Sequence, residues 1–279
     1  MDCVFSSADR ELAARLEGAE AANAMAMAQA AVGSLPGASF ETFGGGTAVF
    51  AGIESPLTHA LGIGFRGTVP EEEMERMETF FRERGSPCLI DLCPMADASV
   101  VAFVQSRPYR AVEFNNVLAR RIGADEVFER SPGVRPASEC EMATWSRVIA
   151  EGFSDPMPAS EELMELLAVC CAGSQCWFGG DGDPAGGGAL GIQNGVALFY
   201  GDATLPLARR KGWQALLIRE RLAAAQRQGC DLGMVSVLPG STSHRNYERA
   251  GFQLIYMRVN VSREFEEQPA VSQAVFCPR

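Results

Sequence analysis

The stretch VALFYGDATLPLARRKGWQALLI, residues 196–218, contains an apolar run, a loop with proline and a second apolar run in direct succession. The first run favours a strand over 196–204, and Pro206 ends it. The second run predicts a helix over 211–228, and Gly212 lets another molecule approach the backbone closely where that helix starts. The free N–H groups and the dipole of a helix start attract anions. This stretch therefore predicts a phosphate-binding loop between a strand and a helix.

Three cations stand at the start of the expected helix: Arg209, Arg210 and Lys211. The chain around them is acidic, with a formal net charge of −11, and Lys211 is its one lysine. Cations at a helix N-terminus oppose the helix dipole, so this cluster is unfavourable until an anion binds there. We therefore expect a bound anion; a solvated basic helix start is the alternative.

The elements expected around this stretch form two similar series, which predict two related α/β units at residues 1–130 and 131–279. In the first series we expect helices at 7–33, 68–84 and 96–106, the second of them opened by a capping box at 68–71, and strands at 39–43, 47–52, 58–65, 87–92 and 109–119. In the second series we expect helices at 138–152, 159–172, 211–228 and 241–250 and strands at 133–136, 174–179, 186–193, 196–204, 231–237 and 252–261. Two unrelated α/β halves remain the alternative, because the repeat rests on the order of elements.

Two motifs in the second series resemble a known family. The pattern Thr204-x-Pro206-x-x-Arg209-x-x-Gly212-x-Gln214-Ala215 resembles the pyrophosphate-binding motif (Arg/Gln)-x-x-Gly-x-(Gly/Ala) of the GCN5-related N-acetyltransferases. The segment Asn246-Tyr247-Glu248-Arg249-Ala250-Gly251-Phe252 resembles the late Tyr-x-x-x-Gly-Phe of that family. Gln214 departs from the pattern, which has Gly or Ala there. The resemblance implies an α/β fold of two tandem acyl-CoA N-acyltransferase-like units, each a mixed twisted β-sheet flanked by helices.

The resemblance also implies an activity and a set of residues. The activity is transfer of an acetyl group from acetyl-CoA to a primary amine of a small molecule or peptide by direct attack, without a metal. The implied cofactor-binding residues are Ala203, Thr204, Leu205, Arg209, Arg210, Lys211, Gly212, Trp213, Gln214, Ala215 and Asn246. Tyr247 is the expected catalytic acid, because a phenol stays protonated at neutral pH and can donate to a departing thiolate. The general base is left open among His244, Glu113, Asp202 and a water chain.

The first unit has a different loop at the equivalent place. Residues 66–73 read RGTVPEEE, so that three carboxylates stand at the start of the expected helix and would repel a pyrophosphate. We therefore expect one cofactor site, with a degenerate first unit as scaffold or substrate wall. The same region spells the dinucleotide fingerprint Gly62-x-Gly64-x-x-Gly67, but the glycines fall within the expected strand at 58–65. A non-catalytic acyl-CoA sensor or regulator, and a nicotinamide-dependent oxidoreductase, are the alternative functions.

Composition excludes several classes of protein. A sequence pI of about 4.8 argues against nucleic-acid and anionic-membrane partners, which both require a basic face. The nine cysteines are scattered without a CxxC pair, and the two histidines add few ligands, so we expect no zinc site. The N-terminus has no signal-peptide pattern, which predicts a cytoplasmic protein. Homodimer formation is left open.

Overall fold

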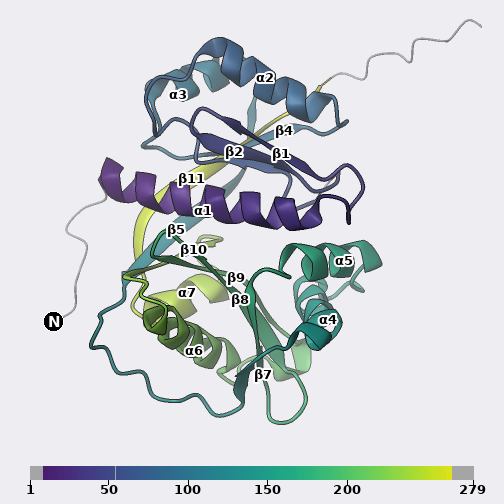
Figure 1. The fold of residues 1–279 in the computed structure, drawn as a ribbon, viewed down its shortest axis with the longest axis vertical. Helices are drawn as coiled ribbons and strands as arrows, with labels where there is room; N and C mark the ends of the chain where they lie inside the picture. Colours follow the sequence, from purple (N-terminus) through teal and green to yellow (C-terminus); the bar gives the residue numbers. More distant parts are fainter. Residues whose placement is uncertain (1–8, 54, 266–279) are drawn as a thin grey trace, which may run out of the picture.

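The computed structural model describes residues 9–53 and 55–265, which form one mixed sheet covered by helices (Figure 1). The first half of the chain contains α1 (Arg10–Ala31), β1 (Ser39–Phe43), β2 (Gly46–Phe50), β3 (His59–Leu61), α2 (Glu71–Arg82), β4 (Cys88–Leu92), α3 (Ala98–Gln105) and β5 (Arg110–Arg121). The second half contains β6 (Val134–Pro136), α4 (Met142–Ser154), α5 (Glu161–Cys170), β7 (Gln175–Gly179), β8 (Gly186–Gln193), β9 (Val196–Thr204), α6 (Trp213–Arg227), β10 (Leu232–Val237), α7 (Thr242–Arg249) and β11 (Gln253–Arg263). This order of elements confirms the predicted fold class.

The order of strands in the sheet is β1-β2-β3-β4-β11-β5-β10-β9-β8-β7-β6. Each half of the sheet therefore contains the last strand of the other half of the chain: β11 pairs with β4, and β5 pairs with β10, both antiparallel. β11 and β5 also pair with each other along the middle of the sheet. The parallel pairs β3–β4 and β9–β10 take equivalent places on the two sides of this middle. The boundary at residue 130 stays a prediction, since the exchanged strands join the two halves in one sheet.

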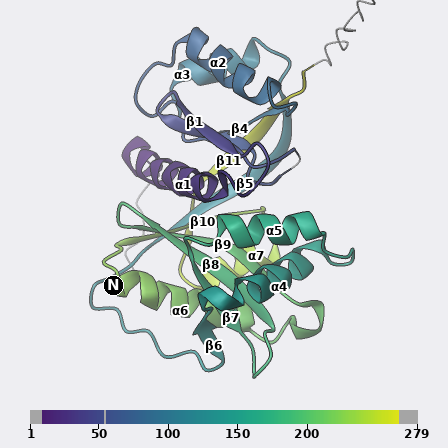
Figure 2. The ribbon, with the colours of Figure 1, turned by 45° about the vertical axis from the view of Figure 1, so that its right-hand side comes forward.

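Helix α1 lies across the middle of the molecule, between its two halves (Figures 1 and 2). It packs against β1, β2 and β3 in the first half and against β8, β9 and α5 in the second. Its buried face is rich in alanine, including Ala13, Ala19 and Ala28, which lets the helix approach the sheet closely. The Asp9 side chain accepts a hydrogen bond from the N–H of Leu12 and so caps its start.

The second half of the sheet is covered on both faces. Successive residues of β8 show the alternation: Ala189 packs into the cluster that contains Trp145 of α4, and Leu190 packs into the cluster that contains Leu217 of α6. Helices α4 and α5 thus lie on one face and α6 and α7 on the other. Residues of α1, Met27 and Ala28 among them, join the cluster on the α4 face.

Two local predictions in the first half are wrong. Helix α2 begins at Glu71 after Pro70, and no side-chain hydrogen bond caps it, so Thr68 forms no capping box. The expected strand over 58–65 is only His59–Leu61 long, because Gly62 and Gly64 have φ of +71° and +85°, which a strand does not accommodate. These glycines therefore follow the strand and do not lie within it.

Candidate active site

The two parallel strands of the second half separate part of the way along. β9 and β10 pair from Val196 with Leu232 to Phe199 with Val235, and β9 then continues to Thr204 beside β8 alone. A bulge interrupts the β8–β9 ladder beyond Tyr200, where Gly201 has φ of +64°. The bulge directs Asp202 toward α6. Beyond the bulge, β8 and β9 pair again through Ala203 and Thr204, immediately before the predicted phosphate-binding loop.

A cavity of about 620 Å³ lies at this end of β9, between the N-termini of α6 and α7. Its walls include Gly152 of α4, Asp202 and Ala208, and Thr242 and Ser243 of α7. Nine of the residues that the sequence assigned to a cofactor also line it: Ala203, Thr204, Arg209, Arg210, Gly212, Trp213, Gln214, Ala215 and Asn246. Leu205 and Lys211 belong to the same loop without lining the cavity.

The loop presents the start of α6 to the cavity. Gly212 is the N-cap of α6 with φ of +84°, a left-handed conformation that favours glycine, and no side-chain hydrogen bond caps the helix. Arg210 also has a positive φ, +66°. The first N–H groups of a helix have no acceptor within it, so these groups are available to an anion in the cavity.

The three cations of the loop have different environments. Arg209 pairs with Asp155 at 2.7 Å and donates to the carbonyls of Gly152 and Thr204, both at 3.2 Å. These contacts fasten the loop to the C-terminal end of α4. Arg210 and Lys211 are exposed and have no hydrogen-bond or ion-pair partner within the described chain. They are therefore the cations that can bind an incoming phosphate.

Gln214, the residue that departs from the family motif, connects two helices. Its Nε2 donates to Ser243 Oγ at 2.8 Å, and its Oε1 accepts from Asn246 Nδ2 at 2.7 Å. The side chain thus extends from α6 toward α7 and forms part of the wall of the cavity. Asn246 is held in place by the same contact.

Tyr247, the expected acid, is fully buried and does not line the cavity. Its hydroxyl donates to Asp202 Oδ2 at 2.5 Å, and Asp202 also forms an ion pair with the buried Arg221. Burial and the negative charge of Asp202 raise the pKa of Tyr247 well above its usual value, although Arg221 acts in the opposite direction. Only Asp202 of these three side chains reaches the cavity, so a catalytic role for Tyr247 stays a prediction.

The pairing of Asp202 with Arg221 was missed by the sequence analysis. A Cβ at Gly188 would lie 2.6 Å from Arg221 Nη1, so the glycine on β8 makes room for the guanidinium. The run Gly186-Gly187-Gly188 in a strand was the available signal, because glycine within a strand often marks a close approach of another group. The other two candidate bases, His244 and Glu113, do not line the cavity. His244 accepts a hydrogen bond from the N–H of Gly240, and the Glu113 carboxylate accepts one from Asn115.

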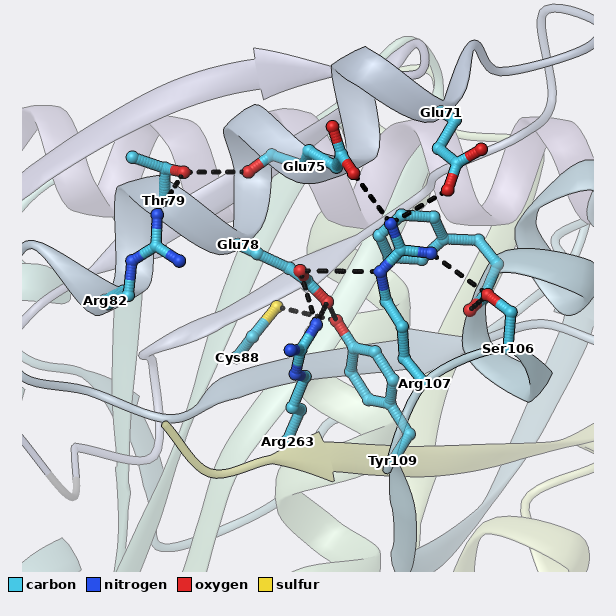
Figure 3. Close-up of polar contacts among 11 residues, drawn as sticks. Glu71, Glu75, Glu78, Thr79, Arg82, Cys88, Ser106, Arg107, Tyr109 and Arg263 are labelled. Carbon is cyan, nitrogen blue, oxygen red and sulfur yellow. Dashed lines mark hydrogen bonds and ion pairs between the residues drawn. The ribbon is translucent and has the colours of Figure 1, made fainter. Parts of the chain in front are cut away.

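The equivalent helix start in the first half, at α2, is occupied by its own side chains (Figure 3). Arg107 donates to both Glu71 and Glu75 at 2.9 Å. One turn further on, Glu78 accepts from Tyr109 at 2.9 Å and pairs with Arg263 at 2.6 Å. Carboxylates therefore stand where the second half has unpartnered cations.

The glycines of the dinucleotide fingerprint have a packing role. A Cβ at Gly62 would lie 3.0 Å from Ala21 of α1, and one at Gly64 would lie 2.8 Å from Val100 of α3. Both glycines thus let neighbouring helices approach the turn after β3. This close packing accounts for them without a dinucleotide.

Within residues 9–53 and 55–265, no group of His, Cys, Asp and Glu side chains could hold a metal ion. The seven cysteines described there are free thiols. No helix of the described part has the length and apolar character needed to cross a membrane.

Comparison with known proteins adds information on the fold. No family model and no curated protein matches the sequence. The chain is similar in structure to a GCN5-related N-acetyltransferase from Kribbella flavida, with a TM-score of 0.62 and 20% identity over 88% of this chain and 95% of that chain. It is also similar to a tandem GNAT protein from the clavulanic acid biosynthesis pathway (TM-score 0.56, 12% identity, 92% and 96% covered) and to a GCN5-related N-acetyltransferase from Sphaerobacter thermophilus (0.52, 17%, 69% and 67%). The chain therefore has the tandem fold of the GCN5-related N-acetyltransferases, as its motifs predicted.

Proposed function

We propose that the protein is an N-acetyltransferase that moves an acetyl group from acetyl-CoA to a primary amine of a small molecule or peptide. The observation that carries this proposal is the cavity at the end of β9. The cavity contains an uncapped helix start, the left-handed Gly212 and the unpartnered Arg210, and the unpartnered Lys211 lies between these two residues in the loop. These are the groups that a pyrophosphate needs when no metal is present.

The residues of the cavity suggest a role for each part of the cosubstrate. The pyrophosphate would bind the N–H groups at the start of α6, with Arg210 and Lys211 beside it. The pantetheine arm would follow residues 203–205 in the manner of an added strand, because β9 has no partner on its β10 side beyond Phe199. The thioester would then lie where β9 and β10 separate. A neutral amine attacks the thioester carbon there, the C–N bond forms, the C–S bond breaks, and the thiolate leaves as a protonated thiol.

A non-catalytic acyl-CoA sensor is the second candidate. The observation in its favour is the burial of Tyr247, whose hydroxyl donates its hydrogen bond to Asp202 and does not line the cavity. Such a protein would bind acetyl-CoA without consuming it.

The test combines binding and turnover in one protein preparation. Calorimetric titration with coenzyme A should give a saturable affinity, and acetyl-CoA with a panel of primary amines should release free thiol. Saturable binding without thiol release for any amine would favour the sensor, and no binding would reject both candidates. A thermal-shift comparison of acetyl-CoA with NAD addresses the oxidoreductase alternative, since a ligand that binds the native state alone raises its stability.

A further inference from the structure

A second, smaller cavity of about 160 Å³ lies under α1 and has walls from both halves of the chain. Strand β3 contributes His59 and Leu61, and α1 contributes Glu20 and Asn23. The second half contributes residues 198–200 of β9 and 234–236 of β10. The cavity is therefore formed only when the two halves of the chain are together, and its volume suits a small molecule or a side-chain arm.

The two cavities approach each other along β9. Tyr200 lines the second cavity and Asp202 lines the first. Two residues of strand span about 7 Å. The paired part of β9 and β10 ends at Phe199 and Val235, which also line the second cavity, so it reaches the place where the strands separate. A group in the second cavity thus lies next to the expected position of the thioester.

One carboxylate, that of Glu20, lines this second cavity, and it belongs to a buried cluster of charged side chains. Arg258 of β11 pairs with Glu17 and Glu20 of α1 and lies 3.6 Å from Asp91 of β4. One guanidinium thus serves three carboxylates. Glu20 also lines the cavity and keeps 22% of its side chain exposed. The lining therefore favours a positively charged ligand over a neutral or anionic one.

His59 has the position of a proton acceptor. Its Nδ1 lies 3.3 Å from Asp91 Oδ1, and its Nε2 has no hydrogen-bond partner within the part of the chain that the structure describes. Burial disfavours the charged imidazole, but the charge and hydrogen bond of Asp91 outweigh it and raise the pKa of His59 above its usual value. A carboxylate on one ring nitrogen fixes the tautomer and leaves the other nitrogen for a substrate.

We propose that the second cavity binds the ammonium group of the acceptor amine, with Glu20 attracting its charge and His59 Nε2 taking its proton. This inference rests on the proposed acetyltransferase function. The ammonium loses a proton to His59, and the nitrogen lone pair forms the new C–N bond at the thioester carbon. The C–S bond breaks, and the thiolate takes the second N–H proton. The products are an amide, coenzyme A thiol and one proton, which His59 passes to solvent.

The first test is His59→Gln, with His244→Gln as a matched control on the only other histidine. Loss of a general base lowers turnover about 100-fold or more, so kcat for the best amine should fall by that factor in His59→Gln and by less than about threefold in the control. The dissociation constant of coenzyme A should stay within about twofold in both variants.

In the wild type, kcat/KM should rise as the pH passes the pKa of His59 and that group becomes neutral. The charged groups that act on His59 are Asp91, Glu20 and Arg258. In His59→Gln, the rise should follow only the pKa of the amine itself.

The second variant is Glu20→Gln, with the exposed Glu72→Gln on α2 as control. Glu20→Gln should raise KM for an alkylammonium substrate about tenfold with kcat changed less, and Glu72→Gln should leave both constants unchanged.

An active wild type whose His59→Gln variant keeps more than a third of kcat and the same pH profile would overturn the inference while the acetyltransferase proposal stands. Coenzyme A binding without turnover of any amine in the wild type would instead remove the proposed function and this inference with it. If His59→Gln does not fold, the KM of Glu20→Gln decides alone.

Discussion

The loops at 204–213 and 66–71 occupy equivalent places in the two halves of the molecule and differ in charge. Each follows the first strand of a parallel pair, β9 or β3, and each precedes a helix, α6 or α2. Each also contains a glycine with positive φ, Gly212 or Gly67. In the second half the helix start carries unpartnered cations, whereas in the first half it carries carboxylates that Arg107 neutralises (Figure 3). The backbone therefore supplies the place for an anion in both halves, and the side chains decide whether one can bind.

A tyrosine, an arginine and a carboxylate contact one another beside α6 in the second half and beside α2 in the first half, but the two sets differ in burial. In the second half, the side chains of Asp202, Arg221 and Tyr247 are almost completely shielded from water. Around Glu78, 25% of the Arg263 side chain and 14% of the Arg107 side chain are exposed. The first set is thus the more sensitive to the loss of a partner, because water cannot replace it.

The largest effect is expected for Asp202→Ala. The substitution leaves Arg221 charged, fully buried and without its carboxylate, which costs about 3–5 kcal/mol in the free energy of unfolding. Urea denaturation followed by circular dichroism measures this loss. In the first half, Glu78→Ala should cost only about 1–2 kcal/mol, because its arginine partners reach water. Equal losses in the two variants would contradict the difference between the two sets.

The next effect concerns the two unpartnered cations. Arg210→Ala combined with Lys211→Ala should weaken coenzyme A binding about 30-fold, or roughly 2 kcal/mol, and the difference from the wild type should shrink as salt is added. Calorimetry at two ionic strengths measures both quantities. The matched change in the first half, Glu71→Gln with Glu72→Gln, should leave coenzyme A affinity within about twofold. Tighter binding in that variant would instead show that coenzyme A binds at the loop of the first half, because the substitutions remove negative charges that repel a pyrophosphate.

The sequence predicted the succession of strand, loop and helix at 196–218 because its signals are local, whereas cofactor binding at this loop stays a prediction. The strand, Pro206, the cations and Gly212 lie within one short stretch, and all but Leu205 and Lys211 of the assigned loop residues line one cavity. The exchange of β5 and β11 was not predicted, because hydrophobic periodicity indicates a strand without indicating its neighbours. The contact of Glu20 with Arg258 depends on that exchange and on the position of α1, and the contact of His59 with Asp91 depends on the pairing of β3 with β4. The burial of Tyr247 likewise depends on a glycine about sixty residues away, Gly188, which makes room for Arg221.

The smallest effect compares the two loop glycines. Gly212 and Gly67 both have positive φ, +84° and +115°, and a Cβ at either would meet no atom within 4 Å. An alanine in such a conformation costs about 1–2 kcal/mol, so Gly212→Ala and Gly67→Ala should lower the free energy of unfolding by similar amounts. Coenzyme A affinity should fall about tenfold in Gly212→Ala alone, because the added methyl group and the strained loop stand where the pyrophosphate approaches the start of α6. Titration of both variants with coenzyme A separates the two consequences. If Gly67→Ala lost affinity to the same degree, backbone strain and not a local contact would govern binding, and the charge difference between the two loops would no longer explain why one of them is a cofactor site.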